Sequence, residues 1–289
     1  MDRIIDAHHH LWKFKERDFG WMNDSMGKLK RDYLLPDLEK ALPADLVSGT
    51  VAVQARQVLE ETSWLLELAE KDNIIKGVVG WLDLRSENLE SQLEKYGDHP
   101  MLVGARHVIH DEVDDDFMLQ PNFIQGIEML GKYDLAYDLL LFPRHLKLAS
   151  RLVSMFPEQR FVLDHISKPP IRSGVLHPWK EDIENLARHR NVWCKISGMV
   201  TEADPSAWVY KDFVPYLDVV CEAFGSQRIM IGSDWPVCKL AADYKEVMKI
   251  PLEFFRKHSI TERSCIFEKN AIDCYKLNIR ELPERETVL

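Results

Sequence analysis

Short apolar or β-branched runs recur along the chain, and longer amphipathic stretches separate them. This pattern predicts parallel strands buried on both faces of a sheet. Eight such runs occur, at residues 4–8, 50–54, 75–81, 102–108, 135–141, 160–165, 191–196 and 228–233. The stretches between and after them predict helices at 60–71, 89–96, 122–133, 144–156, 179–190, 207–224, 242–257 and 261–277, the last capped by Thr261.

Eight strand-plus-helix units in 289 residues predict an α/β protein built as a (β/α)₈ TIM barrel. The alternative is a doubly wound open sheet, which normally uses fewer strands. No repeat or Pro/Gly/Ser linker divides the chain, so we expect one domain over 1–289. It has a long first loop at about 12–36 and a short tail at about 279–289. The 14–34 part of that loop is polar and aromatic, and in a barrel it would lie at the active-site mouth.

Charge narrows the possible functions. Lys and Arg total 37 against 47 Asp and Glu, a formal charge of −10 without any basic block, which disfavours nucleic acid and anionic membranes as partners. No apolar run approaches the roughly 20 residues of a membrane span, and no signal sequence precedes the first strand. Five widely spaced cysteines without a Cys-x-x-Cys pair predict reduced thiols, so we expect a cytoplasmic protein. The sequence leaves open whether the protein forms a homo-oligomer.

The first strand ends in three consecutive histidines. A tag fragment would be longer and would not follow Ile-Ile-Asp-Ala, which leaves a structural cluster or a functional site. Strand alternation places His8 and His10 on one side and sends His9 toward the helical shell. Two imidazoles on one side can converge on one point, so the functional interpretation is favoured.

Polar residues also end most of the other strands. In such a barrel, catalysis is expected at the carboxyl ends of the strands. Burying polar groups there costs free energy unless they pair or act. Each residue alone is weak support, but together they indicate a site: Gln54, Trp81, Arg106, Tyr137, His165, Lys168 and Asp234. The seventh strand, which ends Lys-Ile-Ser-Gly, is the least informative.

Three motifs carry a family resemblance. Asp-Ala-His-His-His-Leu-Trp, Val-Leu-Asp-His-Ile-Ser-Lys-Pro and Ile-Gly-Ser-Asp-Trp-Pro-Val lie on strands one, six and eight. In this order they resemble the amidohydrolase superfamily, over residues 4 to about 278. Within it the chain is similar to the amidohydrolase-related branch that holds L-fuconolactonase, L-rhamnonolactonase and 2-pyrone-4,6-dicarboxylate lactonase.

The resemblance implies a metal plan that this chain follows in part. The superfamily binds one or two divalent metals, and His8, His10, His165 and Asp234 match four of its ligand positions. Strand four offers Arg106 where a bridging lysine or acid is usual, and strand five offers Tyr137 and Asp138 in place of a histidine. Two metals are therefore disfavoured. One Zn²⁺ on His8, His10 and Asp234, or a site without a required metal, both remain open.

We therefore expect hydrolysis of a lactone of a sugar acid or related carboxylate. Asp234 would be the general base, and His8, His10 and His165, with Arg106, would stabilise the oxyanion directly or hold a metal. Substrate binding is assigned to Arg106, Gln54, Tyr137, Lys168 and Trp81. The alternatives are a Zn-dependent decarboxylase of an aromatic or muconate-type acid, and a catalytically inactive binding barrel.

Overall fold

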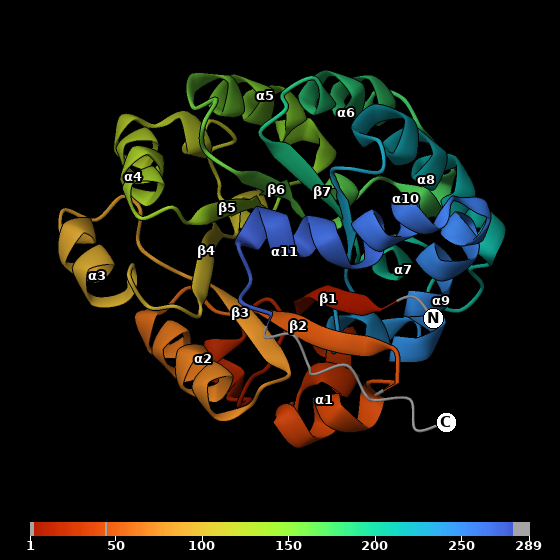
Figure 1. Ribbon diagram of the computed structural model, residues 1–289, viewed down its shortest axis with the longest axis horizontal. Helices are drawn as coiled ribbons and strands as arrows, with labels where there is room; N and C mark the ends of the chain where they lie inside the picture. Colours follow the sequence, from red (N-terminus) through yellow and green to blue (C-terminus); the bar gives the residue numbers. More distant parts are fainter. Residues whose placement is uncertain (1–2, 44, 280–289) are drawn as a thin grey trace, which may run out of the picture.

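A computed structural model describes residues 3–43 and 45–279. It contains eight parallel strands that pair in sequence order, with helices packed outside them (Figure 1). The strands are β1 (Ile4–His9), β2 (Val47–Val53), β3 (Ile75–Gly80), β4 (Leu102–His107), β5 (Ala136–Leu139), β6 (Phe161–Leu163), β7 (Val192–Ile196) and β8 (Ile229–Ile231). Each strand overlaps a predicted run.

Contacts between β1 and the residues after β8 bring the two ends of the sheet together. The Asp234 amide donates to the His8 carbonyl at 2.8 Å, and the His10 amide donates to the Trp235 carbonyl at 2.6 Å. Buried Asp6 adds a side-chain link, because its carboxylate accepts from the Ser233 amide at 2.8 Å and the Ser233 hydroxyl at 2.6 Å. The sheet is thus a nearly closed barrel, and the predicted (β/α)₈ fold is confirmed.

The barrel interior is filled mainly by small and medium apolar side chains, one or two from each strand except β7. They form a buried cluster of Ile5, Ala7, Val51, Val53, Val79, Val103, Ala136, Val162, Met230, Ala271, Cys274, Tyr275 and Leu277. Ala271, Cys274 and Tyr275 come from α11 (Asn270–Tyr275), and Leu277 lies two residues beyond its end. Helix α11 therefore covers the amino-terminal end of the barrel, across the centre of Figure 1. The opposite end of the barrel, at the carboxyl ends of the strands, is not covered by α11 and can hold an active site.

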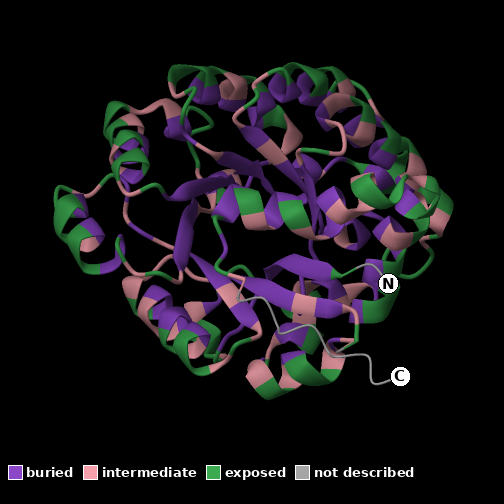
Figure 2. Cartoon of the chain, in the orientation of Figure 1, coloured by how far each residue is buried: buried purple, intermediate pink, exposed green. Residues whose placement is uncertain are grey.

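The helices alternate with the strands, and they differ from the predicted set by two extra short helices and by one helix that is divided in two. They are α1 (Leu35–Ala41), α2 (Leu59–Lys71), α3 (Leu89–Tyr96), α4 (Pro121–Lys132), α5 (Leu146–Met155), α6 (Trp179–Ala187), α7 (Met199–Glu202), α8 (Tyr210–Phe224), α9 (Tyr244–Phe254), α10 (Ile260–Ser264) and α11. Their outer faces are exposed while the strands are buried (Figure 2). Short α1 and α7 are not predicted by the sequence pattern, and a π-helical turn at Cys265–Lys269 separates α10 from α11.

The predicted cap at Thr261 is wrong. The cap of α10 is Ser259, whose hydroxyl accepts from the Glu262 amide at 3.2 Å while the Glu262 carboxylate accepts from the Ser259 amide at 2.9 Å. This reciprocal pair satisfies two amide groups at the helix start. Thr261 lies inside the helix, where its amide and hydroxyl have no such role.

The long first loop is anchored rather than free. Trp12 and Tyr33 exchange two backbone hydrogen bonds of 2.9 Å, which close the loop at its base. The Arg56 guanidinium holds Asp18 at 3.2 Å, and the Lys28 ammonium donates to the Lys239 carbonyl at 3.4 Å. The loop therefore lies against the segment after β8. Of the expected tail at 279–289, all but Ile279 falls outside the described residues.

No helix in the described ranges is long and apolar enough to cross a membrane. All five cysteines are free thiols, and four of them are buried.

Candidate active site

A cavity of about 360 Å³ opens at the carboxyl ends of the strands. It is lined by His10, Trp12, Trp21, Met26, Ala55, Arg106, Val108, His110, Asp111, Leu140, His165, Lys168, Thr201, Glu202, Asp234, Val237 and Leu240. Its residues come from loops all around the barrel, which is the usual position of the active site in this fold.

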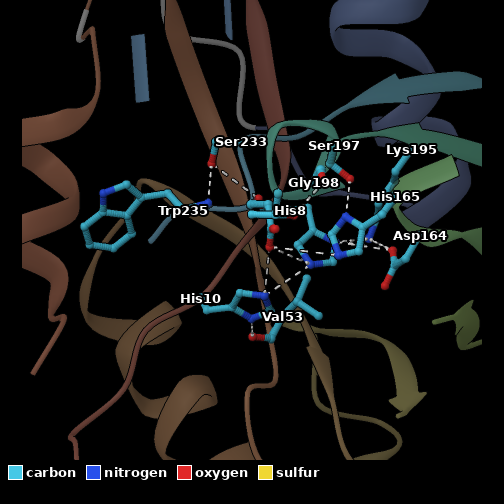
Figure 3. A network of polar contacts seen from close by, with 12 residues as sticks. His8, His10, Val53, Asp164, His165, Lys195, Ser197, Gly198, Ser233 and Trp235 are labelled. Carbon is cyan, nitrogen blue, oxygen red and sulfur yellow. Dashed lines mark hydrogen bonds and ion pairs between the residues drawn. The ribbon is translucent and has the colours of Figure 1, made fainter. Parts of the chain in front are cut away.

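Three imidazoles meet one carboxylate at the floor of this cavity. Oδ1 of Asp234 lies 3.4 Å from Nε2 of His10, and 3.9 Å from Nε2 of both His8 and His165. The Nε2 atoms of His8 and His10 are 3.3 Å apart (Figure 3). All four side chains are buried, so their interactions are screened little by solvent.

The backbone at some of these residues has a conformation that residues other than glycine rarely adopt. His165, Ile166, Ser167 and Lys168 all have positive φ, between 48° and 60°, and Asp234 has φ of 54°. Each left-handed residue costs about 1 to 2 kcal/mol. Strain of this kind is typical of functional sites, where it fixes side-chain directions that regular structure does not provide.

Two imidazoles are oriented from outside the cluster. Nδ1 of His10 donates to the Val53 carbonyl at 2.8 Å, because a carbonyl oxygen only accepts. A neutral His10 therefore presents the Nε2 lone pair to Asp234. Nδ1 of His165 pairs with the Ser197 hydroxyl at 2.8 Å, which directs its Nε2 into the cavity (Figure 3).

A buried ionic network lies directly behind His8. Asp164 is 3.3 Å from Nδ1 of His8, and its other oxygen accepts from Arg106 at 2.9 Å. The Lys195 ammonium lies 3.1 Å from Asp164, 2.5 Å from Asp138 and 3.3 Å from Nδ1 of His8. The Asp138 carboxylate also accepts from the Tyr275 hydroxyl of α11 at 2.8 Å. The network joins the floor of the site to the helix at the far end of the barrel.

Burial and mutual contacts shift the pKa values of Asp234 and of the histidines around it. Burial acts to raise the pKa of Asp234, but His165, His10 and His8 outweigh it, and the pKa lies below its usual range. Burial lowers the pKa of His165 to about 3 and that of His8 well below its usual value. At neutral pH the floor therefore holds an ionised carboxylate beside at least two neutral imidazoles.

A family model described as "Amidohydrolase" matches residues 5–277. The chain belongs to this amidohydrolase family. Among curated proteins it is similar to L-fucono-1,5-lactonases from two bacteria. The protein from Burkholderia ambifaria is 38% identical over 83% of this chain and 82% of its own length. The protein from Burkholderia multivorans is 37% identical over 94% of this chain and 96% of its own length.

Solved structures of other proteins share the fold of this chain. A crystal structure of an amidohydrolase from Burkholderia multivorans with bound zinc has a TM-score of 0.92 at 37% identity, and covers 96% of this chain and 100% of its own. A 2,6-dihydroxybenzoate decarboxylase from Rhizobium has a TM-score of 0.66 at 13% identity over 96% of this chain and 99% of its own. The second likeness shows the shared fold alone.

The amidohydrolase's own residues fit one divalent metal. Ligand atoms of His8, His10 and Asp234 all lie within 4.8 Å of one another. The Val53 hydrogen bond leaves the Nε2 lone pair of His10 available, and a carbonyl partner on the other ring nitrogen is the usual support for a metal-binding histidine. His8, Asp164 and His165 form a second group of this kind, but the cations of Lys195 and Arg106 already neutralise Asp164 there.

The structure brings together five of the predicted site residues and places three elsewhere. His8, His10, His165, Asp234 and Arg106 meet at the floor, and Lys168 lies in the wall. Gln54 is buried beside Arg106, where its amide donates to the Arg106 carbonyl at 3.3 Å, outside the cavity lining.

Trp81 and Tyr137 do not fit the substrate-binding role assigned to them. The Trp81 indole donates to Nδ1 of His107 at 3.4 Å and does not line the cavity. Tyr137 packs edge-on against Phe123 and Phe161 in the apolar layer outside the barrel, because β5 turns its odd-numbered residues outward.

Sequence reasoning missed the residues that support the histidines. Lys195 and Ser197 lie on or just after β7, the strand that was least informative, and Asp164 received no role. A signal did exist: a lysine within the run Val-Trp-Cys-Lys-Ile, on a strand buried on both faces, requires a buried anionic partner. Glu202 and His110 in the cavity wall carry no such signal.

Proposed function

We propose that this amidohydrolase opens the ring of a sugar-acid lactone by adding water to its cyclic ester. One observation carries the proposal: the Asp234 carboxylate lines a cavity and lies within 3.9 Å of three imidazoles. The similarity to two L-fucono-1,5-lactonases supports a sugar lactone as the substrate.

In this proposal Asp234 moves the proton. Its carboxylate takes a proton from water as the water oxygen bonds to the ester carbonyl carbon. The tetrahedral oxyanion then collapses and breaks the ring C–O bond, and Asp234 returns the proton to the leaving alkoxide. The sum is lactone plus water giving the open hydroxy acid, which releases one proton to solvent when it ionises.

The surrounding residues prepare the site for charge on the carbonyl oxygen. Nδ1 of His165 pairs with the Ser197 hydroxyl, so a proton on Nε2 would donate to the carbonyl oxygen, and Arg106 also lines the cavity. Nδ1 of His10 donates to the Val53 carbonyl, so His10 would face the site through Nε2. His8, His10 and Asp234 would hold one divalent metal, which supplies Lewis-acid polarisation when bound.

The proposal is tested by acid release from purified protein. L-Fucono-1,5-lactone is mixed with the enzyme in weak buffer, and a pH indicator follows proton release above the spontaneous rate of ring opening. Rapid, enzyme-dependent release supports the proposal. If neither this lactone nor other aldonolactones release acid faster than buffer alone at high enzyme concentration, the proposed function is wrong.

The proposal also assigns the reaction to the cytoplasm, because five free thiols suit a reducing compartment. The partner assigned to the site is a small-molecule lactone.

A further inference from the structure

Asp6 is a fully buried carboxylate to which the proposed reaction gives no role. It lies on β1, two residues before His8, and it does not line the cavity. Its Oδ1 accepts from the His8 amide at 3.2 Å and from the Ser233 amide at 2.8 Å, and its Oδ2 accepts from the Ser233 hydroxyl at 2.6 Å. One oxygen atom therefore joins the backbone of β1 to the backbone that follows β8.

The Ser233 hydroxyl extends this link to the far side of Asp234. It donates to Asp6 and accepts from the Trp235 amide at 3.1 Å (Figure 3). Both chain neighbours of Asp234 are thus tied to Asp6, one directly and the other through the hydroxyl. The Asp234 amide is fixed as well, because it donates to the His8 carbonyl at 2.8 Å.

Asp234 requires such a clamp because its backbone is strained. Its φ of 54° lies in the left-handed region, where a residue other than glycine stays only if the surrounding structure holds it there. Gly232 allows the clamp to close, since a Cβ at this position would lie 2.6 Å from Cβ of His8. The residues after β8 therefore pack directly against β1, at a distance that one aspartate side chain can bridge.

We infer that Asp6 is a positioning residue for Asp234. From outside the cavity, its carboxylate imposes the left-handed conformation that directs the Asp234 carboxylate toward the three imidazoles. This inference rests on the proposed function, in which Asp234 is the general base, and it assigns no proton transfer to Asp6. Because Asp6 does not reach the cavity, its loss should lower kcat and leave KM nearly unchanged.

Two substitutions at Asp6 separate hydrogen bonding from charge. Asp6→Ala removes both acceptor oxygens, and the resulting displacement of Asp234 should lower kcat for L-fucono-1,5-lactone about 100-fold while KM changes less than about threefold. Asp6→Asn keeps one carbonyl oxygen for the two amides, and its NH₂ group can donate to the Ser233 hydroxyl. It should therefore retain kcat within about tenfold of the wild type. Equal, large losses in both variants would show that charge at Asp6 matters rather than position, and would overturn the inference.

The link through the hydroxyl is tested at Ser233. Ser233→Ala releases the Trp235 amide, so kcat should fall about 10-fold. Because the hydroxyl acts through Asp6, the double variant Asp6→Ala/Ser233→Ala should lose no more kcat than Asp6→Ala alone, which independent sites do not show. Ser233→Ala retains the two amide hydrogen bonds to Asp6, so it decides the question if Asp6→Ala does not fold. Wild-type kcat in Ser233→Ala, or independent losses in the double variant, would contradict the clamp.

A matched control removes another buried hydroxyl. Thr62 of α2 is fully buried, and its hydroxyl donates to the Trp81 carbonyl and accepts from the Trp81 amide, both at 2.8 Å, just after β3. Thr62→Val breaks this pair of hydrogen bonds at the carboxyl end of a different strand and leaves residues 233–235 in place. Its kcat should stay near the wild-type value. A fall as large as that in Ser233→Ala would show that general loosening of the barrel explains both, and would overturn the inference.

Crystal structures of the variants test the position of Asp234 itself. In Asp6→Ala and Ser233→Ala we expect φ of Asp234 to leave the left-handed region, or its Oδ1 to move by about 1 Å or more from its place 3.4 Å from Nε2 of His10. An unchanged Asp234 in both structures would overturn the inference. If the wild type opens no lactone, the lactonase function fails, and these structures still decide whether Asp6 positions Asp234.

Discussion

Lys195 is a fully buried ammonium whose two carboxylate partners, Asp138 and Asp164, are themselves fully buried. Removing one partner of a buried ionic group leaves uncompensated charge, which typically costs about 3 to 5 kcal/mol. We therefore expect Lys195→Met to lower the free energy of unfolding by about that amount in urea titrations.

A second variant distinguishes charge from packing. Adding Asp138→Asn to Lys195→Met removes one of the unpaired carboxylates and should recover part of the loss. If Lys195→Met alone unfolds at the wild-type urea concentration, the ionic network does not stabilise the fold as argued.

Gly198 leaves room for the imidazole of His165. A Cβ at this position would lie 2.6 Å from Nδ1 of His165, and φ is +61°. Gly174 has the same kind of backbone, with φ of +68°, but nothing within 4 Å of its Cβ position. Both Ala variants therefore carry a similar backbone cost, of about 1 kcal/mol. Only Gly198→Ala should also displace His165.

The prediction is a large fall in kcat for Gly198→Ala and near-wild-type kcat for Gly174→Ala, each measured at a temperature where thermal unfolding shows the variant to be folded. Equal kcat values in the two variants would show that the position of His165 does not matter for turnover.

Residue positions along the strands explain which of the predicted side chains lie together in the structure. Alternation along β1 correctly paired His8 with His10, and both meet Asp234. Alternation along β5 is equally regular. The short run Ala-Tyr-Asp-Leu does not indicate whether its odd-numbered or its even-numbered residues face the barrel interior. The Asp138 side chain contacts Lys195 inside the barrel, and Tyr137 packs against Phe123 outside it.

At the scale of elements, periodicity located every strand but not the irregularities that aim side chains. The pairing of β1 with β2 shifts register between Asp6 and His9, so Ala7 fills the interior while His8 also faces the site. The left-handed turn at 165–168 follows β6 and contains no glycine, the residue that usually marks such a backbone in a sequence. Both features depend on contacts with distant strands, which local sequence does not encode.

The start of α10 gives an element-scale prediction. Ser259→Ala removes the hydroxyl that accepts from the Glu262 amide and should lower the free energy of unfolding by about 1 kcal/mol. Thr261→Ala, inside the same helix, should change it by less than about 0.5 kcal/mol. Urea titrations of both variants measure the difference. A larger loss for Thr261→Ala would restore the cap expected from sequence.

For the whole molecule, buried histidines make stability depend on pH. Burial lowers the pKa of His9 and of His165 to about 3, whereas an unfolded imidazole titrates near 6.5. Between these values the unfolded chain binds more protons than the folded one, so the stability present above about pH 6.5 is lost as pH falls toward 3. Each such histidine contributes up to about 1.4 kcal/mol per pH unit. Asp138, whose pKa burial raises to about 6, opposes part of this effect.

Urea titrations between pH 7.5 and 5, with a chelator to remove metal effects, should show steadily falling stability. His9→Gln should reduce the slope, and His177→Gln, at an exposed site, should not. A wild-type stability independent of pH over this range would contradict neutral buried imidazoles.

The whole barrel serves to hold one carboxylate beneath three imidazoles, and the most direct test replaces that carboxylate. In Asp234→Asn, kcat/KM for L-fucono-1,5-lactone is measured together with the unfolding midpoint and the zinc content of the same preparation. We predict a loss of about 100- to 10,000-fold in kcat/KM with the fold retained, because the amide cannot take the proton from water. A folded Asp234→Asn protein that keeps near-wild-type lactonase activity would contradict the central role given to Asp234.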